Sequence, residues 1–311
     1  MLRSRLERPG APVPGGRSVR AAAVLALALA VSMPAAATAT GSRPSSTNRA
    51  AGTPYPVSSP RADCPAQGTA RDITVADAFA PHGRRALWVY RPAGADSADL
   101  PVLYLLHGLP GSSDDFYDSG LAGDVDRAIC AGAAPFVVAA VDGSGPGGID
   151  TEWGDDARHR FGLESLVTGR LVAAVEGAHH RTRQHRAIGG FSMGGYGAVT
   201  LAERHPELYG SVASLDGYFH IDDPDGVFGD SSAAHDPGVL APRARSLRVY
   251  LGVGDRDTVP GIAGETQRYG QLLADEHHPH LEEVVVHGDH SLATARRLFP
   301  SLLRFLETGW R

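Results

Sequence analysis

The sequence predicts an α/β fold in which a mostly parallel sheet carries helices on both faces. Residues 100–106 (LPVLYLL) and 136–141 (FVVAAV) are short, continuous apolar runs, typical of strands buried on both faces. Such runs alternate along the chain with segments of helical spacing, which favours a parallel sheet. Several runs end at small or polar residues, as at His107 and Asp142, and in such sheets the functional site lies at the carboxyl ends of the strands.

Each predicted element carries its own signal. Residues 84–91 (RRALWVYR) alternate like a half-buried strand and stop at Pro92. Short apolar runs predict the remaining strands, at 100–106, 136–141, 186–190, 211–215, 247–253 and 281–286. Apolar residues spaced three and four apart predict helices at 163–179, 194–205, 265–275 and 293–307.

The first 39 residues have the layout of a secretory signal peptide. Five arginines and one glutamate precede a short apolar run over residues 21–33, and small residues follow up to Ala39. The run is too short to span a bilayer, which needs about 20 apolar residues, so we expect cleavage after Ala39 and no stable membrane anchor. Ala37 is the second choice for the cleavage site. The sequence therefore predicts a secreted, extracellular protein.

Cleavage would leave a flexible leader over residues 40–63 and one catalytic domain over 64–311. The leader is rich in Ser, Pro, Thr and Ala and has no apolar periodicity. The formal net charge of −6 becomes −10 in the mature chain, which argues against a nucleic-acid partner. All 29 basic residues are arginine, which excludes Schiff-base or P-loop chemistry on a lysine. In an exported chain the two cysteines, Cys64 and Cys130, predict a disulfide.

Residues 190–194 (GFSMG) match the G-x-S-x-G pattern between a predicted strand and a predicted helix. In this context the pattern forms a nucleophile elbow, a tight turn that needs small residues on both sides of the serine. The helix that follows directs its N–H groups and its positive dipole end toward a forming anion. Ser192 is therefore the expected nucleophile.

An elbow of this kind predicts an acid and then a histidine further along the chain. For the acid we favour Asp257, which lies deeper in the loop after strand 247–253 than Asp255. Asp255 and Asp216 remain alternatives, and Asp216 could instead line the substrate pocket. For the base we favour His290, before the last helix, whereas His287 at the strand end is expected to pack or to orient the loop.

Acyl transfer also needs N–H donors for the tetrahedral oxyanion, each worth about 3–4 kcal/mol in comparable hydrolases. One donor should be the backbone N–H of Met193, directly after the nucleophile. The other should come from the loop over residues 107–111 (HGLPG), where Leu109 is the best candidate because Pro110 has no N–H.

These segments resemble the putative-esterase (esterase D-like) family of α/β-hydrolases. The likeness rests on YLLHGLPGSSDDF, AIGGFSMGGYGAVTLAERHPELYGSVASLDGYF, LGVGDRD and GDHS, and covers roughly residues 87–306. That family includes S-formylglutathione hydrolases, feruloyl and acetyl-xylan esterases and secreted mycolyltransferases. The resemblance places Ser192, Asp257 and His290 at the triad positions, with Leu109 and Met193 at the oxyanion positions.

The resemblance also implicates two substrate-binding residues. Residues 142–153 (DGSGPGGIDTEW) resemble a tryptophan-containing loop near the active site of secreted members, which implies that Trp153 contacts substrate. Asp216 departs from the family, because many relatives have a small polar or apolar residue there. Residues 218–240 form a long irregular stretch that we expect to cap the site and to set selectivity.

The sequence thus predicts a secreted serine esterase that hydrolyses carboxylic esters of small molecules or carbohydrates and needs no cofactor or metal ion. The main alternative is an acyltransferase that passes the acyl group to a carbohydrate hydroxyl. A non-catalytic binding protein on the same fold would normally have lost a triad member, and all three residue types stand here in order.

Overall fold

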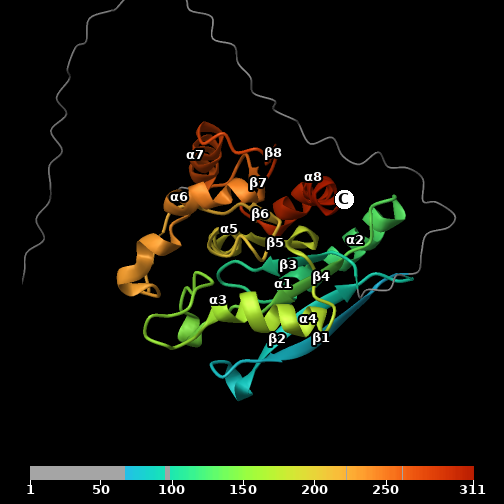
Figure 1. Ribbon diagram of the computed structural model, residues 1–311, viewed down its shortest axis with the longest axis horizontal. Coiled ribbons are helices and arrows are strands. Elements are labelled where there is room, and N and C mark those ends of the chain that lie inside the picture. Colours follow the sequence, from blue (N-terminus) through green and yellow to red (C-terminus); the bar gives the residue numbers. More distant parts are fainter. Residues whose placement is uncertain (1–66, 95–98, 222, 261) are drawn as a thin grey trace, which may run out of the picture. The chain divides into compact units, whose positions relative to one another are not determined.

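The computed structural model describes residues 67–94, 99–221, 223–260 and 262–311, which form a sheet covered by helices (Figure 1). Eight strands make up the sheet in the described part of the chain, in the order β1-β2-β4-β3-β5-β6-β7-β8. The strands are β1 (Thr69–Ala76), β2 (Arg84–Arg91), β3 (Val102–Leu106), β4 (Val137–Val141), β5 (Arg186–Phe191), β6 (Ser211–Leu215), β7 (Arg248–Gly254) and β8 (Leu281–Val286).

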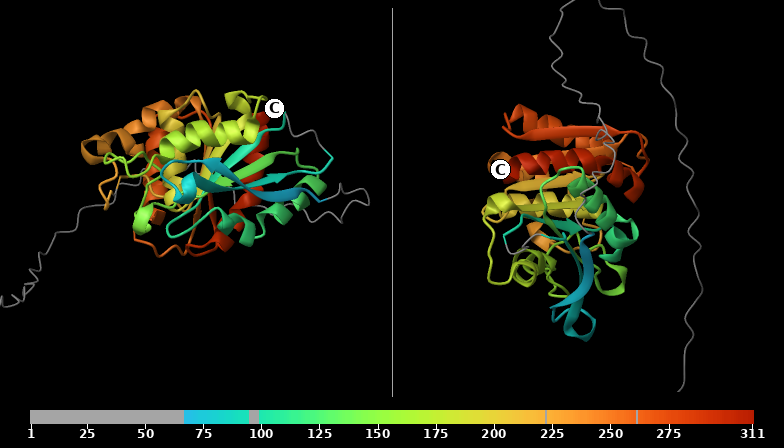
Figure 2. Two further views of the ribbon diagram at one scale, coloured as in Figure 1. Left: turned by 90° about the horizontal axis from the view of Figure 1, so that it is seen from below. Right: turned by 90° about the vertical axis from the view of Figure 1, so that its right-hand side faces the viewer.

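The sheet is parallel from β4 to β8, and β1 and β2 join it as antiparallel strands. Helices pack on both faces, as Figure 2 shows. One face holds α3 (Leu163–Ser165), α4 (Val172–Glu176), α5 (Met193–Arg204) and α7 (Ile262–Asp275). The other holds α1 (Asp114–Asp118), α2 (Leu121–Cys130) and α8 (Leu292–Trp310), and the short α6 (Pro237–Leu240) precedes β7.

Strand β3 shows why continuous apolar runs form the centre of this sheet. Its residues alternate between two cores, with Val102, Tyr104 and Leu106 on one face and Leu103 and Leu105 on the other. All five are buried. A strand buried on both faces has no position at which a polar side chain would reach water, so the run carries no polar alternation. The predicted α/β fold with a mostly parallel sheet is confirmed.

The predicted elements agree with the structure apart from one helix, and several elements of the structure, α2 and α6 among them, have no predicted counterpart. The helix expected over 163–179 is wrong in detail: it contains a wide, π-type turn at Leu166–Leu171 and ends earlier, where Gly177 adopts a φ of 58°. Strand β1 was not predicted because only Val75 of its eight residues is buried, and its pairing with β2 depends on the backbone. The short helix α1 was also not predicted.

The predicted signal peptide, the whole predicted leader and Cys64 lie outside the described residues. Cys130 is the last residue of α2. Over the ranges that the structure describes, we find no helix both long and apolar enough to cross a membrane.

Candidate active site

The structure brings Ser192, His290 and Asp257 into one hydrogen-bonded chain at the carboxyl edge of the sheet. Ser192 stands between β5 and α5, Asp257 in the loop after β7, and His290 in the loop between β8 and α8. The His290 Nε2 atom lies 3.0 Å from the Ser192 Oγ atom, and the His290 Nδ1 atom lies 2.7 Å from the Asp257 Oδ2 atom. His290 therefore contacts both Ser192 and Asp257 directly, the arrangement that a serine, a base and an orienting acid need.

Ser192 has the strained backbone that a nucleophile elbow requires. Its φ of 57° and ψ of −122° are rare for a residue with a side chain. The turn closes because its neighbours have no side chain: a Cβ on Gly190 would lie 2.1 Å from the Gly194 oxygen, and one on Gly194 would lie 2.0 Å from the Leu106 oxygen. Both contacts are with backbone that cannot move aside, so the glycines of the motif are steric requirements.

The His290–Asp257 pair is arranged for proton transfer. The Asp257 side chain is fully buried, and its Oδ1 atom accepts the Val259 N–H at 2.8 Å. Since Asp257 accepts a hydrogen bond from Nδ1–H, the Nε2 atom of His290 is free to accept the Ser192 hydroxyl proton. The ring of Phe191 packs at 4.8 Å from the imidazole ring and limits its tilt.

Asp255, one of the two alternative acids, contacts His287, and neither residue contacts Ser192. Asp255 lies 3.1 Å from the Nδ1 atom of His287, and both side chains are exposed. Asp255 also accepts the Gly288 N–H, which fixes the loop that leads to His290. A hydrogen bond from the His287 side chain keeps the Asp255 pKa below its usual value. This pair therefore shapes the loop and lies outside the serine's hydrogen-bonded chain.

The two predicted oxyanion residues flank Ser192. Met193 is the first residue of the twelve-residue helix α5, so its N–H is one of the donors left without an intrahelical partner at a helix N-terminus. On the opposite side, Gly108 lies so close that a Cβ there would be 3.0 Å from the Ser192 Cβ atom. Leu109 follows directly, and its side chain is exposed.

Comparisons with known proteins bear on the family. The family model described as "Putative esterase" matches residues 80–306. The chain belongs to this esterase family. It is 33% identical over 129 residues to an uncharacterized protein of Corynebacterium glutamicum and 30% identical over 147 residues to S-formylglutathione hydrolase of Rattus norvegicus. These segments cover 39% and 41% of this chain but only 29% and 49% of the two relatives.

Solved structures agree with the family on the fold. A ferulic acid esterase superposes with a TM-score of 0.68 at 22% identity, over 79% of this chain and 99% of that one. Because the sequence identity is low, this comparison supports the α/β-hydrolase fold and nothing about the activity.

In this member of the esterase family, buried side chains hold the loop over residues 107–111 from behind. Gly143 donates its N–H to His107 Nε2 at 2.7 Å, which leaves the proton on Nδ1 to donate to the Gly108 oxygen at 2.8 Å. Trp153 donates its indole N–H to the His107 oxygen at 3.1 Å. Trp153 has an exposed fraction of 0%, so the structure places it behind the loop instead of on a surface that substrate could reach.

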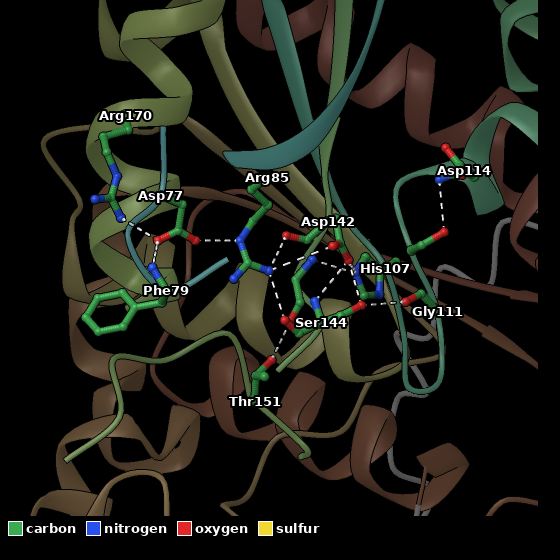
Figure 3. Close-up of polar contacts among 12 residues, drawn as sticks. Asp77, Phe79, Arg85, His107, Gly111, Asp114, Asp142, Ser144, Thr151 and Arg170 are labelled. Atoms are coloured by element: carbon green, nitrogen blue, oxygen red, sulfur yellow. Dashed lines mark hydrogen bonds and ion pairs between the residues drawn. The ribbon is translucent and has the colours of Figure 1, made fainter. Parts of the chain in front are cut away.

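A second layer of contacts, drawn in Figure 3, anchors the same region. Arg85 pairs with Asp77 at 2.6 Å and donates to the carbonyl oxygens of Asp142 and Ser144 at 3.1 and 2.9 Å. Burial raises the pKa of Asp142, but the neighbouring His107 ring and the hydrogen bonds from the Ser144 side chain and N–H outweigh burial and bring the value to about 2. The Asp142 carboxylate beneath the loop therefore stays negatively charged at neutral pH.

Sequence reasoning missed Arg85 as a supporting residue. A signal existed, because Arg85 occupies a buried position of the alternating strand β2, and a charged residue there needs partners.

Asp216, the other predicted substrate-binding residue, lies at the end of β6 with an exposed fraction of 0%. Its Oδ1 atom accepts the Gly254 N–H at 2.7 Å. Asp216, Asp257 and His290 form the one cluster of potential metal ligands found among the described residues, with ligand atoms within 4.8 Å of one another. Both ring nitrogens of His290 already contact Ser192 and Asp257, so neither is free for a metal ion.

The stretch 218–240 is tied to the helix that carries the nucleophile. Tyr196, one turn after Ser192, donates its hydroxyl to the His235 oxygen at 2.6 Å. The ring of Tyr218 stacks on the ring of Tyr196 at 4.9 Å. Tyr218 and His235 of this stretch therefore contact the first turn of α5 directly.

Proposed function

We propose that this protein is a serine hydrolase of carboxylic esters that works through an acyl-enzyme on Ser192. The observation that carries the proposal is the hydrogen-bonded chain from Ser192 through His290 to Asp257, built on a strained elbow. Membership of the esterase family supports it.

The proposed reaction has two halves. In the first, Ser192 Oγ attacks the ester carbonyl while His290 Nε2 takes the hydroxyl proton, and Asp257 stabilises the imidazolium that forms. The N–H groups of Met193 and Leu109 hold the oxyanion. His290 then gives its proton to the leaving alcohol as the C–O bond breaks. In the second half, a water molecule loses a proton to His290 and attacks the acyl-enzyme. His290 then returns that proton to Ser192 Oγ as the bond between Oγ and the acyl carbon breaks and the carboxylic acid leaves.

The proposed substrate class is suggested by the names of similar proteins. One superposed structure is a ferulic acid esterase, and one relative is an S-formylglutathione hydrolase. We propose that small-molecule or carbohydrate-linked esters are the substrates and that residues 218–240 contribute to their selection.

Three variants test the proposed triad with a p-nitrophenyl ester. Ser192→Ala should abolish hydrolysis in a folded protein. Asp257→Asn should lower kcat by about 10⁴, since the imidazole then adopts the wrong tautomer. Asp255→Asn is the matched control and should leave kcat within about threefold, because Asp255 contacts His287 instead. Retained activity in Ser192→Ala, or a loss in Asp255→Asn with none in Asp257→Asn, would contradict the assignment.

Hydrolysis and acyl transfer differ only in what attacks the acyl-enzyme. A panel of acyl and aryl esters, run with and without a sugar acceptor, separates them. We expect free acid as the product in both cases. Acylated sugar as the main product would replace the esterase with an acyltransferase.

We further propose export by cleavage after Ala39, a leader over 40–63, a catalytic domain over 64–311 and a Cys64–Cys130 disulfide. After expression in a secreting host, N-terminal sequencing should begin at Thr40, and mass spectrometry of the non-reduced protein should show one linked peptide pair. Retention of the first 39 residues, or two free thiols, would refute the corresponding proposal.

A further inference from the structure

Asp216 is a second carboxyl group beside the triad, and the proposed mechanism gives it no step. It directly follows β6, its φ is 49°, and its side chain is fully buried. A residue other than glycine keeps such a backbone conformation only where surrounding contacts compensate for its cost. The chain therefore holds this carboxyl group in a defined place at the edge where Ser192 stands.

The two oxygens of Asp216 have unequal surroundings. Oδ1 accepts the Gly254 N–H at 2.7 Å, whereas Oδ2 is buried with no hydrogen-bond partner among the described residues. The Asp257 carboxylate and the His290 ring lie within 4.8 Å. A buried anion with one bare oxygen beside a second anion is unfavourable, and protonation removes that charge.

The groups that act on Asp216 come from two loops. Asp257 faces it from the loop after β7, and His290 and Asp289 face it from the loop before α8. Burial is the largest influence and raises the pKa of Asp216, the Gly254 hydrogen bond lowers it, and the charge of Asp257 raises it again, to about 7.

We propose that Asp216 is a positioning residue that takes up a proton beside the Asp257–His290 pair, so that the number of carboxylate anions facing His290 changes with pH. This inference rests on the proposed function of Ser192 and His290. Asp216 contacts neither the reacting atoms nor Ser192. It acts through its own charge, which is absent while its carboxyl group is protonated.

The consequence is a dependence of activity on the charge of Asp216. When Asp216 loses its proton, a second anion faces the His290 ring, and a ring that has bound a solvent proton beside it cannot accept the proton of Ser192. The acid limb of kcat/KM should be broader than a single ionisation and displaced to higher pH.

Asp216→Asn tests this consequence because it keeps the shape and the Oδ1 acceptor while removing the titratable proton. With p-nitrophenyl acetate, we expect the acid limb of Asp216→Asn to become a single ionisation and to move about one pH unit lower. Asp289→Asn is the matched control: that carboxylate is next to His290 in sequence but exposed, so the limb should move by less than about 0.3 unit.

Two outcomes would overturn the proposal. An unchanged acid limb in Asp216→Asn would show that Asp216 does not titrate with the pair. A uniform loss of activity at every pH would show a structural role alone.

Infrared spectroscopy gives a readout that needs neither activity nor a variant. In the full chain, with aspartate labelled by carbon-13 in the side-chain carboxyl, we expect a protonated-acid carbonyl band that disappears as the pH rises through about 7. Absence of an aspartic acid band at pH 6 would overturn the proposal. If the wild-type chain hydrolysed no ester, the proposed function would be wrong. The infrared titration would still show whether Asp216 is protonated.

Discussion

At the scale of single residues, the site separates groups that touch the reaction from groups that hold them in place. Ser192, His290 and Asp257 form the hydrogen-bonded chain, whereas Trp153 lies behind the loop that carries Leu109. A tryptophan with no exposed surface acts through its packing against the His107 ring and through the hydrogen bond that its indole N–H donates to the His107 oxygen. Its effect on catalysis should therefore appear as misplacement of the oxyanion donors.

We expect Trp153→Phe to lower kcat about tenfold and to leave KM within threefold. The variant leaves the buried His107 oxygen without its donor, at a cost of about 1–3 kcal/mol, and tenfold in rate corresponds to about 1.4 kcal/mol. Steady-state kinetics on folded protein is the measurement. Trp88→Phe is the control, because Trp88 is equally buried but its indole nitrogen has no hydrogen-bond partner among the described residues. Equal losses of kcat in both variants would count against the positioning role.

At the scale of elements, the turn from β5 to α5 is the tightest crossing in the site. Gly194 meets the backbone of Leu106 and His107 from β3 and its loop, so the elbow and the oxyanion loop are packed directly against each other. The close approach means that the position of Ser192 and the position of the loop over residues 107–111 depend on the same short motif.

Gly194→Ala should therefore destabilise the fold and abolish esterase activity, since its Cβ would lie 2.0 Å from a backbone oxygen. Gly169→Ala offers the matched control: this glycine lies in the helical turn at Leu166–Leu171, and a Cβ there meets nothing within 4 Å. Removing a glycine from a helix should raise the free energy of unfolding by up to about 1 kcal/mol. Thermal unfolding and p-nitrophenyl ester hydrolysis report both effects. A Gly194→Ala protein with wild-type stability would disprove the steric argument.

At the scale of the whole molecule, buried carboxylates join segments that are far apart in sequence. Glu164 of α3 lies 2.6 Å from His205 Nε2 and 2.9 Å from Arg204 Nε at the end of α5, and 3.6 Å from His235 in the 218–240 stretch. Burial raises the pKa of Glu164, but the hydrogen bonds from His205, His235 and Arg204 outweigh it and hold the pKa far below its usual value.

A carboxyl group whose pKa is lowered on folding stabilises the protein above its unfolded pKa and loses that contribution as the pH falls. Between pH 5 and 3, the free energy of unfolding should therefore drop more steeply in the wild type than in Glu164→Gln, by about 1–2 kcal/mol. Urea denaturation at several pH values measures the difference. Glu207→Gln serves as the control, since Glu207 also faces His205 but is exposed. Parallel pH dependences in wild type and Glu164→Gln would contradict this account.

The sequence allowed prediction of the features that depend on local order. Ser192 could be assigned because its motif stands between a strand and a helix, and Asp257 because it lies further along its loop than Asp255. The burial of Trp153 could not be predicted, since it depends on how His107, Arg85 and the loop after β4 meet in space. The state of Asp216 likewise depends on the loops after β7 and before α8, which only the fold brings beside it.

The order of the triad along the chain has a consequence for biosynthesis. The elbow at Ser192 is complete once β5 and α5 pack on β3, but Asp257 and His290 follow β7 and β8, the last two strands of the described chain. Until β8 pairs with β7, no base stands beside the serine, and a serine hydroxyl without a base is a poor nucleophile. If Ser192 and His290 act as proposed, we expect a partly folded or truncated chain to leave the esters around it unreacted, and reactivity of Ser192 toward a fluorophosphonate should appear only when folding has finished.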